Sequence, residues 1–288
     1  MFVSGFSFVR NAIKYDYPII EAILSILPIC DEFIIAVGNS EDETLELIKS
    51  INSNKIKIIE TIWDDSIREG GRVLAIETDK ALAAISNESD WAFYIQGDEV
   101  VHEKYLENIK SAMLHYKDNT EVDGLLFKYT HFYGSYKYIG DSTRWYDREI
   151  RVIRPKRNIY SYRDAQGFRK NNNEKLKVKE IDAEIYHYGW VKMPEIMQRK
   201  QEDFNKLWHD DAWIDDNIPK VVKFDFSKID KLKLFTGTHP EVMSQRINDK
   251  KYNYEIDLSG NKSSVKDKIK KSLKKIGINL SYQNYIKI

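Results

Sequence analysis

The first hundred residues alternate apolar runs with segments of helical periodicity. The apolar runs cover 2–9, 32–37, 55–63 and 91–96, and the helical segments between them cover 18–27, 40–51 and 70–86. Ser40 and Glu43 have the S-x-x-E spacing of a capping box, which marks the start of the second helix. Strands separated by helices of this length predict βαβ units that form a parallel sheet.

The pattern changes after about residue 117. Three further strands are expected at 123–134, 148–155 and 179–190, and a helix followed by polar, irregular chain is expected from residue 193. Tyrosine and tryptophan are dense between residues 129 and 162, either as strand and core residues or as the wall of a cleft for a polar ring compound. We therefore expect an α/β protein with a mixed sheet flanked by helices and a mainly helical C-terminal extension.

The last 28 residues have the pattern of a basic amphipathic helix. Val265, Ile269, Leu273 and Ile276 share one helical face, and lysines fill the remainder. Such a helix can lie on anionic lipid, where each lysine contributes about 1 kcal/mol. The alternative is a solvated helix that packs its apolar stripe on the protein. The segment 261–288 is thus a candidate for peripheral contact with a membrane.

Composition narrows the class of protein. Of the 288 residues, 42% are hydrophobic and 12% aromatic, which is typical of a globular protein. The 45 basic residues balance 45 acidic ones, so no overall field favours nucleic acid as a partner. Cys30 is the one cysteine, which excludes an internal disulfide, and no apolar run approaches the ~20 residues of a membrane span. We expect a cytoplasmic protein.

Candidate chemistry follows the fourth apolar run. The chain passes from WAFYI directly into Gln96-Gly97-Asp98-Glu99. In parallel sheets, ligands bind beyond the carboxyl ends of the strands, and Gly38-Asn39 follow the second run in the same way. Either these positions are ordinary polar turns, or the carboxylates hold a ligand at the edge of the sheet.

These segments, in this order, resemble family 2 glycosyltransferases of the GT-A fold. The resemblance runs from FSFVRNAIK through DEFIIAVGNSEDET and GGRVLAIETDKALA to WAFYIQGDEVVHE, and continues more weakly in WYDREIRVIRP, YRDAQGF and IYHYGW. It implies a GT-A domain over 1–190, with a nucleotide-binding half (1–117) and an acceptor-side half (118–190). Residues 191–260 would then complete the acceptor side, ahead of the basic tail 261–288.

The resemblance also implies an activity: inverting transfer of a sugar from a nucleotide-sugar donor to a glycan or lipid-linked acceptor, in surface polysaccharide biosynthesis. Two alternatives stay open. One is a nucleotidyltransferase of the same fold, although no glycine- and lysine-rich phosphate loop follows the first strand. The other is a non-catalytic protein that binds sugar nucleotides and has lost its metal.

A divalent metal is implied by the family's aspartate-x-aspartate signature, which Gln96-Gly97-Asp98 matches. Asp98 would bind Mg²⁺ or Mn²⁺ bridging the donor diphosphate, since a hard cation takes carboxylate and phosphate oxygens. Gln96 departs from the signature, because an amide is a poor ligand and can instead bond a ribose or phosphate oxygen. His187 corresponds to a family histidine and is either a metal ligand, a donor-phosphate contact or a core residue.

Further donor contacts are implied at several loops. Arg10 and Asn11 match the family's nucleotide-contacting turn. Gly38 and Asn39 stand where many relatives have two base-recognising aspartates, and the following Asp42 fits the pattern. Arg72 either contacts the diphosphate or is an ordinary surface arginine.

Inverting displacement needs a base that takes the proton of the acceptor hydroxyl. Asp164 in YRDAQGF is the best match to the family's acidic residue, and Glu149 and Asp147 are its rivals.

Overall fold

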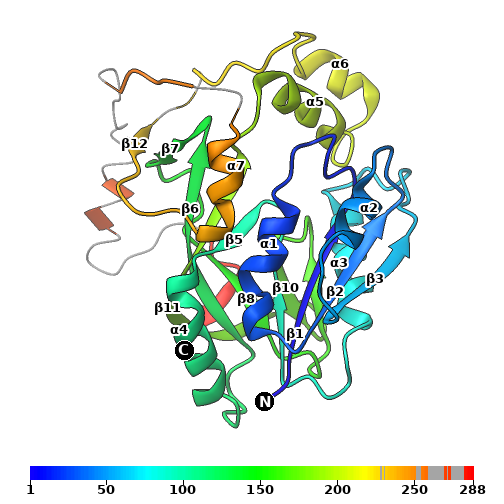
Figure 1. The fold of residues 1–288 in the computed structure, drawn as a ribbon, viewed down its shortest axis with the longest axis vertical. Helices are drawn as coiled ribbons and strands as arrows, with labels where there is room; N and C mark the ends of the chain where they lie inside the picture. The colour runs from blue at the N-terminus through cyan, green and yellow to red at the C-terminus, as the bar shows by residue number, and fades with distance from the viewer. Residues whose placement is uncertain (228, 230, 251–253, 259–268, 271, 274–281) are drawn as a thin grey trace.

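The computed structural model describes residues 1–288 except 228, 230, 251–253, 259–268, 271 and 274–281 (Figure 1). One mixed sheet has the strand order β3-β2-β1-β4-β8-β6-β11-β10-β9. Its first four strands are mutually parallel: β1 (Val3–Val9), β2 (Glu32–Gly38), β3 (Ile56–Thr61) and β4 (Trp91–Tyr94). The connections between them carry α1 (Ile19–Ile26) with the 3-10 turn η1 (Leu27–Ile29), α2 (Thr44–Lys49) and α3 (Arg72–Ala83).

Helices cover both faces of this parallel part. Phe33, Ile35 and Val37 of β2 belong to one buried cluster with α1 and α4, whereas Ile34 and Ala36 belong to another cluster with α3. A strand buried on both faces needs apolar residues at every position, which explains the uninterrupted apolar runs in the sequence.

The direction of the sheet reverses at β8 (Arg148–Ile153). This strand is antiparallel to β4 on one side and to β6 (Gly124–Tyr133) on the other. The long strand β11 (Glu174–Trp190) then lies parallel to β6. Between β4 and β6 the chain forms β5 (Glu99–Val101), which pairs with β11, the 3-10 turn η2 (Glu103–Tyr105) and α4 (Leu106–His115). The mixed sheet flanked by helices confirms the fold class predicted from the sequence.

The remaining elements are short. Two further strand pairs are formed by β7 (Ser135–Gly140) with β12 (Leu232–Leu234), and by β9 (Ile159–Tyr162) with β10 (Gly167–Lys170). The 3-10 turn η3 (Glu241–Met243) precedes α7 (Ser244–Asn248). Most of the predicted basic tail lies outside the described residues. Its end forms β13 (Tyr285–Lys287), which runs parallel to β11 and so joins the main sheet.

The helix expected from residue 193 is α5 (Pro194–Asn205). A second helix, α6 (Asp211–Asn217), forms where the sequence predicted irregular chain, because Asp210 caps its first turn by accepting from the backbone N–H of Trp213. Figure 1 shows both above the ends toward which the parallel strands run. They are therefore placed over the edge of the sheet where the sequence puts its candidate chemistry. No helix among the described residues is long and apolar enough to span a membrane.

Candidate functional site

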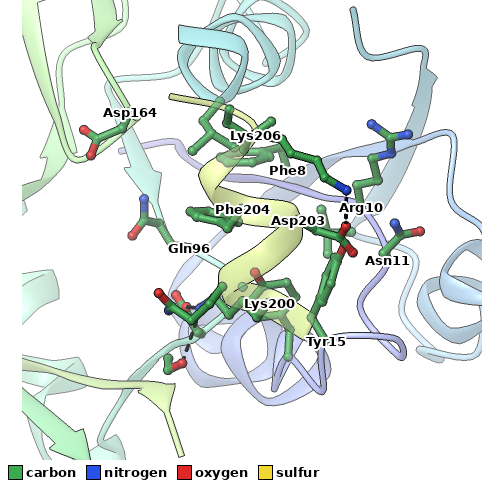
Figure 2. Close-up of a pocket in the computed structure, with 18 of the residues that line it drawn as sticks. Phe8, Arg10, Asn11, Tyr15, Gln96, Asp164, Lys200, Asp203, Phe204 and Lys206 are labelled. Carbon is green, nitrogen blue, oxygen red and sulfur yellow. Dashed lines mark hydrogen bonds and ion pairs between the residues drawn. The ribbon is translucent and has the colours of Figure 1, made fainter. Parts of the chain in front are cut away.

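A cavity of about 590 Å³ opens at the carboxyl end of the parallel strands. Its wall combines the loops after β1 and β4, the end of β11, and one face of α5 with the turn that follows it. In Figure 2, α5 crosses the pocket, with Arg10 and Asn11 on one side and Gln96 and Asp164 on the other. Six of the residues predicted for the site line this cavity: Arg10, Asn11, Gln96, Asp98, Asp164 and His187.

Asp98 contributes a carboxylate to the cavity wall beside a histidine and a lysine. Its side chain is 13% exposed, and its Oδ2 lies 3.7 Å from Nε2 of His187 and 3.4 Å from Nζ of Lys200. Burial opposes ionisation of this carboxyl, but the electrostatic interactions with His187, Lys200 and Lys192 outweigh burial and lower the pKa of Asp98 to about 2. Asp98 is therefore an anion at neutral pH.

Glu99, the adjacent carboxylate, has a different role. It is fully buried and forms a two-point ion pair with Arg151, at 2.8 Å from Nε to Oε2 and 2.7 Å from Nη2 to Oε1. The hydroxyl of Tyr129 donates to Oε1 at 2.8 Å. Two adjacent carboxylates thus point in different directions. One faces the cavity, and the other holds the strands β5 and β8 together from within the core.

Gln96 does not face Asp98. Its Nε2 donates to the backbone carbonyl of Ala165 at 3.1 Å and also lies 3.4 Å from the hydroxyl of Tyr94. The amide consequently ties the end of β4 to the loop that carries Asp164. Gln96, which replaces the first aspartate of the aspartate-x-aspartate pattern, thus has a structural role here.

The loops that follow β1, β2 and β3 form one end of the cavity. Asn11 has a left-handed φ of 56°, and its Oδ1 accepts from the backbone N–H of Glu41 at 2.7 Å. The Arg10 guanidinium lies 5.4 Å from the centroid of the Trp63 ring and donates from Nε to the carbonyl of Asn39 at 3.0 Å. An indole face and a guanidinium plane together form a surface on which a flat base can stack.

Four predicted residues lie outside the lining of this cavity. Gly38 is packed against Trp63, where a Cβ would come within 2.3 Å of the indole nitrogen. The Oδ1 of Asn39 accepts from the backbone of Trp63 at 3.0 Å, and Asp42 accepts from the backbone of Lys14 at 2.7 Å. These three residues shape the loops that carry the lining. Arg72 opens α3 and is exposed.

The α5 face was missed by the sequence reasoning. Met197, Lys200, Gln201 and Phe204 line the cavity at helical spacing, and Asp203 joins them. Tyr15 donates to Oδ2 of Asp203 at 2.8 Å, which fastens α5 to the loop after β1. The signal in the sequence was a helix with lysine, glutamine and phenylalanine on one face, directly after the strand that ends in IYHYGW.

A second cavity of about 580 Å³ adjoins the first. The two share Tyr146, Asp164 and Gln166 in their walls. Asp164 lies between Arg163 and Ala165, which have left-handed φ values of 56° and 61°. Burial raises the pKa of its carboxyl. A strained loop thus presents a proton-accepting group at the junction of the two cavities.

The rivals of Asp164 face only the second cavity. Glu149 is 4% exposed and accepts from Nε2 of Gln166 at 3.1 Å. Burial raises the pKa of Glu149 to about 8, so it is largely protonated at neutral pH. Asp147 is paired with Arg148.

Asp98 and His187 could supply some of the ligands of a metal ion, with the remaining ligands coming from water and substrate. Among the described residues, no group of three or more His, Cys, Asp and Glu side chains could hold a metal by itself. Mg²⁺ typically takes only one or two protein carboxylates and completes its shell with water and substrate phosphates. Oδ2 of Asp98 and Nε2 of His187 lie together on the wall and match that requirement.

Comparisons with known proteins find solved structures only: no family model and no curated protein matches the chain. The chain is similar to TarS of S. aureus in complex with UDP, at 16% identity over 70% of this chain and 64% of that chain, with a TM-score of 0.43. It is similar to TarS in complex with UDP-GlcNAc at 14% identity over 75% and 70% of the chains, with a TM-score of 0.42.

A third similar structure is glucosyl-3-phosphoglycerate synthase of Mycobacterium tuberculosis in complex with Mn²⁺, UDP and phosphoglyceric acid. The identity is 21% over 45% of this chain and 43% of that chain, with a TM-score of 0.30. The chain thus spans less than two thirds of the UDP-bound TarS chain and of the synthase. Some of the similar structures were solved with UDP or a UDP-sugar. The function proposed below is argued from the two cavities of this protein.

Proposed function

We propose that this protein is an inverting glycosyltransferase that moves a sugar from a nucleotide-sugar donor to a glycan or lipid-linked acceptor. The observation that carries the proposal is the position of Asp164 in the wall shared by the two cavities. A single displacement needs the donor on one side of the base and the acceptor hydroxyl on the other. Two adjoining cavities with a carboxyl at their junction meet this need.

The donor occupies the first cavity. Its base stacks at the end formed by Trp63 and Arg10, and its diphosphate lies toward Asp98 and Lys200. Asp98 and His187 would hold a divalent cation there. When bound, that cation neutralises charge on the leaving diphosphate. Lys200 adds a positive charge of the protein's own at the same end of the cavity.

The acceptor occupies the second cavity and presents a hydroxyl to Asp164. The carboxylate of Asp164 takes the hydroxyl proton as the oxygen attacks the anomeric carbon of the donor sugar. The bond from that carbon to the diphosphate oxygen breaks in the same step, and nucleoside diphosphate leaves. Glu149 cannot serve in this way at neutral pH, because its raised pKa leaves it protonated. The acceptor class, a place in surface polysaccharide biosynthesis and a cytoplasmic location with membrane contact through 261–288 are parts of the proposal that stem from the sequence.

Product analysis tests the proposal. The full chain is incubated with a panel of nucleotide sugars, Mn²⁺ and glycan or lipid-linked acceptors, and the released nucleotide is identified. A glycosyltransferase releases nucleoside diphosphate or, for some sugars, nucleoside monophosphate together with a glycosylated acceptor. Conversion of nucleotide sugar and pyrophosphate into nucleoside triphosphate and sugar phosphate would instead identify a nucleotidyltransferase. Binding of the donor without any turnover would favour the non-catalytic alternative.

A further inference from the structure

Two histidines from neighbouring strands meet beside Asp98. His131 on β6 and His187 on β11 are register partners in the parallel ladder. Their Nδ1 atoms are 3.1 Å apart, and the ring planes are inclined by 70°. His131 does not line the donor cavity and was not among the residues expected in the site.

The hydrogen-bond partners of the two rings determine where their protons are. Nε2 of His131 lies 2.7 Å from the backbone carbonyl of Tyr146, and a carbonyl can only accept. The proton of the neutral His131 ring is therefore on Nε2, and its Nδ1 is an acceptor. A hydrogen bond between the two Nδ1 atoms then requires that His187 donates from Nδ1.

This assignment leaves a lone pair on Nε2 of His187. That atom faces Oδ2 of Asp98 at 3.7 Å, so two electron-pair donors face each other across the wall of the cavity. Two acceptors are stable at this separation only beside a positive charge. In this structure the ammonium of Lys200 supplies it, at 3.4 Å from Oδ2 of Asp98 and 3.3 Å from the carbonyl of Gly189.

We propose that His131 is a positioning residue for the cation site: it fixes the tautomer of His187 that keeps Nε2 free to bind a divalent cation together with Asp98. This inference rests on the proposed function, because the cation acts there on the donor diphosphate. Ligating histidines usually donate their second ring N–H to a carboxylate, a carbonyl or water. Here the acceptor is another imidazole.

The surroundings of His131 hold it in that orientation. Its ring stacks on Trp145 with centroids 5.0 Å apart and planes inclined by 30°, and on Tyr129 at 5.6 Å and 29°. Because the ring is fixed between two aromatic faces and a backbone carbonyl, it cannot turn to exchange its two nitrogens without losing these contacts. The tautomer of His187 is thus set by the fold before any ligand arrives.

NMR of the full chain with ¹⁵N-labelled histidine tests the inference directly, since the ring-nitrogen signals report which nitrogen carries the proton. Replacement of each histidine in turn assigns the signals. We expect wild-type His187 to be protonated on Nδ1 without any ligand. His131→Phe keeps a ring but removes the acceptor, and should shift the proton of His187 to Nε2, where Asp98 accepts it. His131→Asn places an amide oxygen near Nδ1 and should keep the wild-type tautomer.

The same variants are titrated with Mn²⁺ in the presence of UDP, with affinity measured from the signal of free Mn²⁺ in electron paramagnetic resonance. His131→Phe should weaken Mn²⁺ binding roughly 10- to 100-fold, and His131→Asn much less. Thermal unfolding of both variants checks that the fold is kept. A wild-type His187 protonated on Nε2, or a folded His131→Phe protein with unchanged Mn²⁺ affinity, would overturn the inference.

The two readouts separate this inference from the proposed function. The tautomer is measured without nucleotide, so it stands or falls by itself. Failure of every nucleotide to bind would defeat the proposed function and leave the tautomer assignment in place. Nucleotide binding with Mn²⁺ alongside the opposite tautomer would defeat only the role of His131.

Discussion

At the scale of single residues, the adjacent carboxylates Asp98 and Glu99 show how one strand end serves two purposes. Glu99 turns inward to a buried arginine, and Asp98 turns outward to the cavity. Asp98 lies in the turn between β4 and β5, closed by the backbone hydrogen bond from Glu99 to Gln96, whereas Glu99 is the first residue of β5, and this change of conformation separates the two side chains. A substitution of Asp98 should therefore leave the buried Glu99–Arg151 ion pair largely intact.

Asp164 and Glu149 provide a matched pair for the catalytic base. Asp164→Asn removes a proton acceptor at the junction of the cavities, so we expect transfer to fall by about 10²- to 10⁴-fold while donor binding is kept. Glu149→Gln changes a carboxyl that is already protonated at neutral pH, so transfer should stay near wild type. Steady-state release of nucleoside diphosphate measures both. Equal losses in the two variants would show that Asp164 has no special role.

Glu149 also predicts a dependence of stability on pH. Its pKa is raised in the folded protein to about 8 from an ordinary value of 4.5. Between these two values the unfolded chain ionises this group and the folded chain does not, so the free energy of unfolding should fall as pH rises. The total loss of unfolding free energy is on the order of 5 kcal/mol, because each unit of pKa shift corresponds to ~1.4 kcal/mol. Glu149→Gln should remove it.

Denaturant titrations at pH 5, 6.5 and 8 measure this dependence. The variant and the wild type should converge at low pH, and the variant should be the more stable protein at pH 8. A difference that does not change with pH would contradict the assignment of a protonated Glu149.

At the scale of elements, α5 is the part of the site that carries the missed residues. Asp203 fixes it to Tyr15 and Lys14, and Lys200 reaches Asp98 from the same helix. The helix thus connects the two ends of the donor cavity. Its contacts with the loop after β1 through Asp203 are polar.

Lys200→Gln tests the contribution of α5. We expect nucleoside diphosphate binding to weaken by roughly 10-fold or more, because a charge-assisted contact contributes about 1.5–3 kcal/mol. Arg199→Gln is the matched control, since Arg199 is exposed on the same helix and does not line the cavity. Calorimetric titration with UDP, GDP and CDP measures both. Equal weakening in the two variants would indicate a general effect of charge.

Membrane binding by the basic tail can be tested with substitutions that leave β13 in the sheet. Removal of the whole segment 261–288 would also remove β13, which pairs with β11. Replacement of Lys266, Lys268, Lys274 and Lys275 by glutamine keeps β13 and should weaken binding to anionic vesicles, with about 1 kcal/mol for each lysine near the surface. Cosedimentation with anionic and neutral vesicles measures it. Unchanged binding to anionic vesicles would return the segment to a packing role.

At the scale of the whole molecule, the sequence predicted the parts whose physics is local. The apolar runs predicted β1 to β4. Every residue of β2 and β4 is buried, whereas β3 lies at the edge of the sheet and keeps exposed polar residues. The position of Asp98 after the fourth strand predicted that it lies at the edge of the sheet, where it lines the cavity. The motif YRDAQGF predicted Asp164, which lies at the junction of the two cavities. The α5 wall, His131 and β13 could not be found in this way, since each reaches its place through contacts between segments distant in the sequence.

Calorimetric titration of the full chain with nucleoside diphosphates and nucleotide sugars, each with Mn²⁺ and with chelator, tests the central claim most directly. We predict that one nucleotide binds, that Mn²⁺ strengthens its binding, and that Asp98→Asn removes the strengthening by Mn²⁺. Absence of binding by every nucleotide, or a gain from Mn²⁺ that survives in Asp98→Asn, would contradict the account of the donor site.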